Sequence, residues 1–162
     1  MNYHFGYSVF ASIKKITELG KDHVQPTFGQ YDYISVDGHK PEEIPFWTKN
    51  PTEVFILQLK NMLSQTKFSD KQIKLSDIER IDIITGGDHG AGAFRCPICI
   101  VLKFTDGTYV QTECSIAHIQ CKKDNGVVLE NTIIDPLGDG LKELLQNPFK
   151  LFYNSNGQLK IQ

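Results

Sequence analysis

The sequence predicts an α+β fold: N-terminal helices, then a mainly antiparallel, mixed sheet against which one or two helices pack. Three observations favour it. Apolar residues recur at helical spacing before residue 70, strand-like runs separated by turn residues fill the middle of the chain, and leucines recur at helical spacing near residue 140. The same observations predict a helical and irregular segment at 1–70, followed by an α/β domain at 71–162.

Two helices are predicted in the first segment. The helix over 8–19 begins at Ser8, a residue type that caps helix N-termini, and it stops before a glycine. The helix over 51–65 begins with Pro51 at its first position, where a missing N–H costs nothing. Between the two helices, prolines and glycines interrupt regular structure, and only a short strand around 31–36 is predicted.

Strand patterns dominate the second segment. Turn residues such as Thr105-Asp106-Gly107 separate the apolar runs and predict hairpins. The predicted elements are, in chain order, a helical turn at 76–80, strands at 81–85, 98–104, 108–114 and 117–122, a helix within 135–146, and strands at 149–153 and 158–161.

Composition and charge restrict the class of protein. The chain has 162 residues, is 40% hydrophobic and carries a net charge of -2, so any nucleic-acid contact needs a local basic patch. No apolar run approaches the roughly 20 residues that a bilayer-spanning helix needs, and the first 15 residues lack the order of a signal peptide. We therefore expect an intracellular protein, nuclear or cytoplasmic, with reduced cysteines and no membrane partner.

The stretch richest in candidate functional residues is Ile81–Arg95, which reads IDIITGGDHGAGAFR. Asp88 and His89 follow an apolar strand and are flanked by glycines. Glycines let a backbone approach a ligand closely, and an Asp at a strand end can hold a divalent metal. The alternative is a glycine-rich turn in which Asp88 caps backbone amides. The spacing fits neither the dinucleotide-binding fingerprint nor a phosphate-binding loop.

Four cysteines, Cys96, Cys99, Cys114 and Cys121, lie within one short window. A C-x2-C pair followed by two further cysteines is typical of structural zinc sites. However, the apolar residues after Cys99 indicate a strand, in which residues three apart point to opposite faces. We therefore favour core thiols over a zinc site.

The candidates for nucleic-acid contact are the basic residues of the C-terminal half. They are Arg95, Lys103, Lys122 and Lys123. The alternative for these residues is an ordinary solvated face of a nearly neutral protein.

Two stretches, ERIDIITGGDHGAGAFRCPICIVLKFTDG and HIQCKKDNGVVLENTI, resemble uncharacterised proteins encoded by mobile elements in invertebrate and other eukaryotic genomes. Those proteins carry GGDHG-x-G-x-FR after an apolar strand, then a hairpin and a CKKD-N/T segment. The resemblance covers about residues 51–135. By analogy with cut-and-paste transposases, it implies an RNase H-like domain. Asp88 would be the first of three carboxylates that hold two Mg or Mn ions.

The sequence departs from that pattern at the second acid. The candidate positions hold Asn154, Asn156 and Gln158, and the sequence stops before a third acid. Neutral amides bind such metals less well than carboxylates and cannot act as a general base. We therefore expect a truncated or domesticated transposase-derived domain, which binds nucleic acid or protein without cleaving it.

Two other functions remain open from the sequence. An intact metal-dependent nuclease or hydrolase would centre on Asp88 and His89, with Asp82, Asp106 or Glu113 completing its site. A structural adaptor would instead use the four cysteines as a zinc staple.

Overall fold

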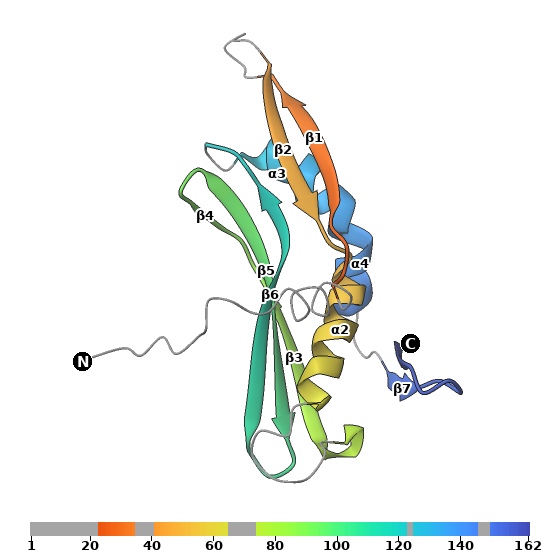
Figure 1. The fold of residues 1–162 in the computed structure, drawn as a ribbon. Coiled ribbons are helices and arrows are strands. Elements are labelled where there is room, and N and C mark those ends of the chain that lie inside the picture. Colours follow the sequence, from red (N-terminus) through yellow and green to blue (C-terminus); the bar gives the residue numbers. More distant parts are fainter. Residues whose placement is uncertain (1–22, 35–40, 65–73, 123–124, 146–149) are drawn as a thin grey trace, which may run out of the picture.

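The computed structural model describes residues 23–34, 41–64, 74–122, 125–145 and 150–162. Within these ranges the chain has an α+β fold with a mainly antiparallel sheet and packed helices, as the sequence predicts (Figure 1). The helix predicted at 8–19 lies outside the described residues.

Six strands form the main sheet. Their spatial order is β1-β2-β6-β5-β3, and β4 follows β3 along the same edge of β5. The strand pairs of this sheet are antiparallel. Because β2 pairs with β6, strands from both sides of residue 70 belong to one sheet. The strands are β1 (Thr27–Tyr33), β2 (Glu42–Thr48), β3 (Ile78–Thr85), β4 (Asp88–Gly90), β5 (Ala93–Phe104) and β6 (Tyr109–Ile119).

The sheet differs from its prediction in several places. Strands β2 and β4 were not predicted, because Pro41, Pro45 and the glycines of 86–92 indicate loops. Strand β1 begins at Thr27 rather than near 31, and β5 begins at Ala93 rather than at 98. The helical turn predicted at 76–80 is a shorter 3-10 turn, η1 (Leu75–Asp77), so β3 begins earlier than expected. The separate strand predicted at 117–122 was wrong, because β6 continues without a break to Ile119. A bulge opposite Cys96 and Pro97 lets the β5–β6 ladder pass a proline that has no N–H to donate.

Helices follow β2 and β6. Helix α2 (Pro51–Ser64) agrees with its prediction. The second helical run begins earlier than predicted, because the Asn125 side chain caps it by accepting from the Val127 N–H. This run is α3 (Gly126–Leu129), the π-helical turn η2 (Glu130–Ile134) and α4 (Asp135–Leu145). No described helix is both long and apolar enough to cross a bilayer.

The π-helical turn lies immediately before a proline. Pro136, the second residue of α4, has no N–H, and its ring would clash with a carbonyl one turn earlier in a regular helix. The wider turn η2 precedes this position, and the Asp135 N–H bonds to the Glu130 carbonyl. The helical run therefore continues to Leu145 despite the proline.

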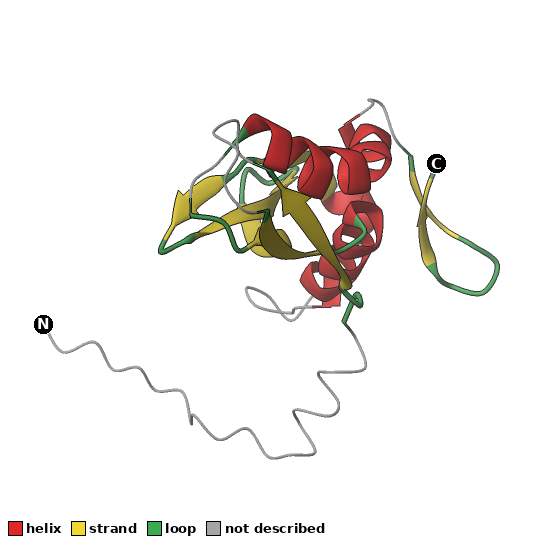
Figure 2. Ribbon diagram, turned by 90° about the horizontal axis from the view of Figure 1, so that it is seen from above, coloured by secondary structure: helices red, strands yellow, loops and turns green. Residues whose placement is uncertain are grey.

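The helices lie against one face of the sheet, which we call the helical face (Figure 2). Side chains of β5 alternate strictly, so Ile98, Ile100 and Leu102 are fully buried there, while Lys103 is exposed on the other side. We call this other side the open face. The largest fully buried side chains of the core come from both layers: Phe55, Leu59, Ile98, Ile100, Leu102, Ile116, Ile119, Leu137, Leu144 and Leu159.

A second, two-stranded sheet consists of β7 (Leu151–Tyr153) and β8 (Leu159–Ile161), as the sequence predicts. Its strands pair with each other, and Leu159 is buried in the main core. Leu151 of β7 and Ile161 of β8 are partly buried against the same core, so this hairpin is attached to it through apolar side chains of both strands.

The glycine-rich motif forms a tight β-hairpin. Gly90 pairs with Ala93, and the two residues between them, Ala91 and Gly92, have φ values of 52° and 76°. Positive φ at both central residues defines a type I′ turn, whose twist matches that of the flanking strands. Before the hairpin, Gly87 leaves room for the Phe94 ring, because a Cβ at Gly87 would overlap that ring. These glycines therefore have a structural role.

Replacing Gly87 should show this role directly. Gly87→Ala is expected to lower the free energy of unfolding by about 1–3 kcal/mol, because the Phe94 ring packs against the core and must move. Gly86→Ala is the matched control, since no atom lies within 4 Å of its Cβ position. Urea denaturation measures both, and equal stabilities of the two variants would contradict the assigned role.

Candidate functional site

Asp88 and His89 lie on β4, an edge strand, and their side chains diverge. Neighbouring residues of a strand point to opposite faces. Asp88 is exposed on the open face, directly across from Arg95. His89 is half-buried, and its Nε2 donates to the Cys121 carbonyl at 2.9 Å. His89 therefore fastens β4 to the chain beyond β6, and the two residues do not form a joint acid–base pair.

The structure does not bring the other candidate carboxylates to Asp88. Asp82 and Asp88 pair with β5 residues six positions apart, which is roughly 20 Å along a strand. Glu113 pairs four positions from the partner of Asp88, roughly 13 Å along the strand. Asp106 lies in the β5–β6 turn, where it accepts a bond from the Thr108 N–H at 2.9 Å. Carboxylates that share a metal must come within about 4–6 Å, so these residues do not fit a two-metal site.

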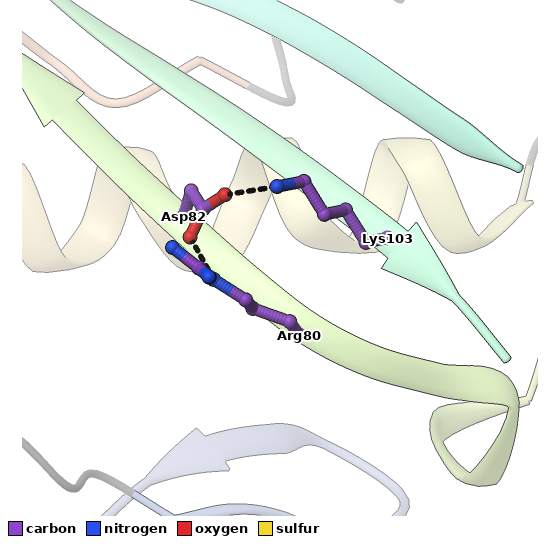
Figure 3. Close-up of polar contacts among 3 residues, drawn as sticks. All are labelled: Arg80, Asp82 and Lys103. Carbon is purple, nitrogen blue, oxygen red and sulfur yellow. Dashed lines mark hydrogen bonds and ion pairs between the residues drawn. The ribbon is translucent and has the colours of Figure 1, made fainter. Parts of the chain in front are cut away.

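Asp82 instead belongs to an ionic cluster at the far end of the open face (Figure 3). Its carboxylate accepts from Arg80 Nε and lies 3.1 Å from Lys103 Nζ. The hydrogen bond from Lys103, and then that from Arg80, hold the pKa of Asp82 below its usual value. A cavity of about 390 Å³ beside β3 is lined by residues 80–84, Leu144 and Leu145, and Asp88 is not among them.

The cysteines are divided between the two faces. Cys96 is buried on the helical face, whereas Cys99 faces the open side, which confirms that this pair points in opposite directions. Burial raises the pKa of the Cys96 thiol, so it is protonated at neutral pH and is a poor metal ligand. Within the described ranges, no three His, Cys, Asp or Glu side chains gather as metal ligands would.

The neutral residues at the proposed second-acid position build a turn. Asn154 Oδ1 accepts from the backbone N–H of Asn156 at 3.1 Å and from that of Gln158 at 2.8 Å. This pattern closes the β7–β8 hairpin, because an Asn side chain can imitate a backbone acceptor. The Asn154 side chain thus has a local role that needs no metal, and its Nδ2 also donates to Gln158 Oε1 at 3.3 Å.

The described members of the predicted nucleic-acid set, Arg95, Lys103 and Lys122, are dispersed over the sheet rather than gathered in one patch. Lys103 pairs with Asp82, and Lys122 lies 3.9 Å from Glu42. Lys123 lies outside the described residues. Arg95 is exposed on the open face, eight residues along β5 from Lys103 and therefore at the other end of the sheet. Of the predicted set, Arg95 alone lies in the cluster described next.

A row of residues crosses the open face beside Arg95. Register pairs Phe28 with Trp47, Trp47 with His118, and His118 with Arg95. Paired residues in antiparallel strands share a face, so these four side chains lie side by side across β1, β2, β6 and β5. Lys49 joins them from the end of β2, with its Nζ 5.5 Å from the centre of the Trp47 ring. We call Phe28, Trp47, Lys49, Arg95 and His118 the open-face cluster.

Aromatic stacking holds the centre of this cluster. The rings of Trp47 and His118 are nearly parallel, with planes 10° apart and centroids 6.0 Å apart. Phe28 is 75% exposed, an unusual position for a large apolar side chain. Two basic side chains border the stacked pair: Arg95 lies beside His118 in the row, and Lys49, two residues beyond Trp47 on the same strand, reaches over the Trp47 ring. Flat rings beside cations are suited to a ligand that has both aromatic faces and negative charge.

The sequence did not indicate four of the five members of this cluster. Phe28, Trp47 and Lys49 come from one segment, where β1 pairs with β2, and the pairing of β2 with β6 adds His118 from more than 60 residues later. The alternating pattern of EEIPFWT in β2 was the available signal, because it places Trp47 on the face opposite the buried Ile44 and Thr48.

Asp82 supplies a test of the ionic cluster. Since its folded-state pKa is lowered, it stabilises the fold above its unfolded pKa of about 3.9, and this contribution is lost as pH falls through the folded value. Asp82→Asn should therefore be less stable than the wild type at pH 7, and this difference in stability should shrink as the pH falls below about 4. The gap at pH 7 should shrink in a Lys103→Gln background, as measured by urea denaturation. A gap independent of pH would contradict the cluster.

Comparisons with known proteins add no family to these observations. Protein-family models, curated proteins and solved structures were compared with the chain, and none of them matched. The function proposed below therefore depends on the residues of the open face and on their arrangement.

Proposed function

We propose that this domain binds nucleic acid on the open face of its sheet and does not cleave it. The observation that carries the proposal is the open-face cluster, in which Lys49 and Arg95 accompany stacked Trp47 and His118. Lysine and arginine neutralise phosphates, and this term supplies most of the affinity of sequence-independent binding. A chain of net charge -2 needs a local group of basic residues to contact nucleic acid, and Lys49 and Arg95 provide one.

The separation of the carboxylates supports binding without cleavage. Phosphodiester hydrolysis by two metals needs several carboxylates at one point, to hold the ions and offset their charge. Asp88 faces Arg95, whereas Asp82 is held by Arg80 and Lys103 at the other end of the sheet. Mg or Mn at Asp88 would therefore have one carboxylate and a neighbouring cation, which is an unfavourable set of groups.

A transposase-like origin remains part of the proposal. The run from β3 to α4, in which β3 pairs with β5 and β5 with β6 before the helices, is compatible with the start of an RNase H-like domain, with β4 as an additional strand. The hairpin β7–β8 is paired within its own sheet. We propose that the domain retains the first part of this arrangement and uses its sheet for binding.

A protein partner is the second candidate, and one observation favours it. Ile84 on the edge strand β3 is 57% exposed beside the cavity that Leu144 and Leu145 line. An exposed strand edge beside apolar side chains can accept an extended peptide as an added strand. These residues belong to β3 and α4 and share no member with the open-face cluster, so the two candidates can be tested by separate variants.

Electrophoretic mobility shifts with a labelled oligonucleotide, measured at several salt concentrations, test the leading proposal. The wild type should bind, and Arg95→Ala should weaken binding and reduce the salt slope by about 0.7–1, the share of one phosphate contact. Lys103→Ala is the matched control, because Lys103 is engaged by Asp82 at the other end of the sheet. An equal loss in both variants would contradict the assigned face.

Asp88→Asn separates binding from catalysis. Its carboxylate stands directly across from Arg95, so removing the charge should tighten binding about two- to fivefold at low salt. A nuclease with Asp88 as a metal ligand would instead lose its activity in this variant. Incubation with Mg or Mn should leave the oligonucleotide intact with either protein. Cleavage that requires Asp88 would replace this proposal with the enzyme, and absence of both binding and cleavage would favour the protein partner.

A further inference from the structure

We infer that the ligand of the open face is single-stranded nucleic acid, with unpaired bases stacked on Phe28 and Trp47. This inference rests on the proposed function and names its substrate class. The cations alone would accept the phosphates of any nucleic acid. The aromatic half of the cluster adds a requirement that a duplex cannot meet, because a duplex keeps its base faces stacked inside.

The exposure of Phe28 is the first argument. Its side chain is 75% exposed on the open face, while Phe46, one residue before its partner Trp47, packs against the core on the other face. A large ring held in water loses the burial that would stabilise it, unless a ligand covers it. A flat base with a hydrophobic face provides that cover, and every base has one.

The arrangement of the row is the second argument. Phe28 and Arg95 lie three strand spacings apart, roughly 14 Å, with Trp47 and His118 between them. A strand of a few nucleotides laid across the sheet can therefore stack bases at the Phe28 end and place phosphates near Lys49 and Arg95. Stacking platforms bordered by cations are the general means by which proteins hold single strands.

Shape is the third argument. Duplex grooves admit an α-helix or a two-stranded ribbon. Here the residues that would contact the ligand lie side by side near one end of four neighbouring strands, on a face that the described helices leave open. A sheet face of this kind fits an extended single strand of nucleic acid better than it fits the groove of a duplex. The open face also carries carboxylates. Asp88 lies on the far side of Arg95, Glu113 lies along β6, and Asp82 lies on β3. Asp32 and Glu43 pair with each other four residues along β1 and β2 from Phe28 and Trp47, at the opposite end of these two strands.

The chain contains one tryptophan, so its intrinsic fluorescence reports the proposed site directly. The full chain would be titrated with a twelve-nucleotide thymidine strand and, separately, with a duplex that carries the same number of phosphates. We expect saturable quenching of Trp47 by the single strand and at least tenfold weaker binding of the duplex.

Phe28→Ala is the decisive variant, because substitution of so exposed a side chain leaves the core intact. It should weaken single-strand binding by roughly 5- to 150-fold, the loss of one stacked base, and leave duplex binding unchanged. Tyr109→Ala is the matched control, since Tyr109 is 65% exposed on the same face at the opposite end of β6.

The outcomes distinguish this inference from the proposed function. If single strand and duplex bind equally, and Phe28→Ala changes neither while Arg95→Ala weakens both, the face contacts phosphates alone and the inference is overturned. If neither nucleic acid binds, the proposed function itself fails. Selective loss of single-strand binding in Phe28→Ala, with Tyr109→Ala unaffected, supports both.

Discussion

The arrangement of this domain depends on the alternation of side chains along β5. Ile98, Ile100 and Leu102 are fully buried against the helices, and this burial fixes the register of β5 with both neighbouring strands. A shift of one residue would turn this apolar set toward the open face and move its polar neighbours into the core. The positions of Asp82 and of Arg95 on the open face both follow from this one register.

The bulge at Pro97 divides β5 into two parts, which contribute to opposite ends of the sheet. After the bulge, from Ile98 to Phe104, β5 pairs with β3, and the open face there carries the ionic cluster around Asp82. Before the bulge β5 pairs with β4, and β6 pairs with β2, whose Trp47 stacks on His118. The glycine-rich turn at Ala91-Gly92 connects β4 to β5. The glycine-rich motif around Asp88 and His89, which suggests a catalytic site in the sequence, therefore helps to position Arg95 on the open face.

Local patterns predicted much of this fold. The helix α2, the β5–β6 hairpin and the β7–β8 hairpin follow from apolar periodicity and turn residues near in sequence. The continuity of β6 through residues 115 and 116 was not predicted, because the bulge there depends on Pro97 in the neighbouring strand. The early start of the second helical run was missed because Asp124-Asn125-Gly126 is also typical of a turn, and only the Asn125 cap distinguishes the two.

The candidate site was harder to predict than the fold. Adjacency in sequence placed Asp88 with His89, but a strand sends neighbouring side chains to opposite faces. The open-face cluster arises from long-range pairing of β1, β2, β6 and β5, and no short motif encodes it. Arg95 was singled out for its charge, whereas Trp47 and His118 acquire a role only when β2 is placed beside β6.

The most direct test of the central claim, that the open face binds nucleic acid, is a map of amide chemical shifts by NMR during titration with a short single-stranded oligonucleotide. The account predicts that the largest changes fall on Phe28, Trp47, His118 and Arg95, and that the Trp47 indole N–H shifts with them. Changes concentrated at β3, Leu144 and Leu145, or on the helices, with the open-face cluster unmoved, would contradict it.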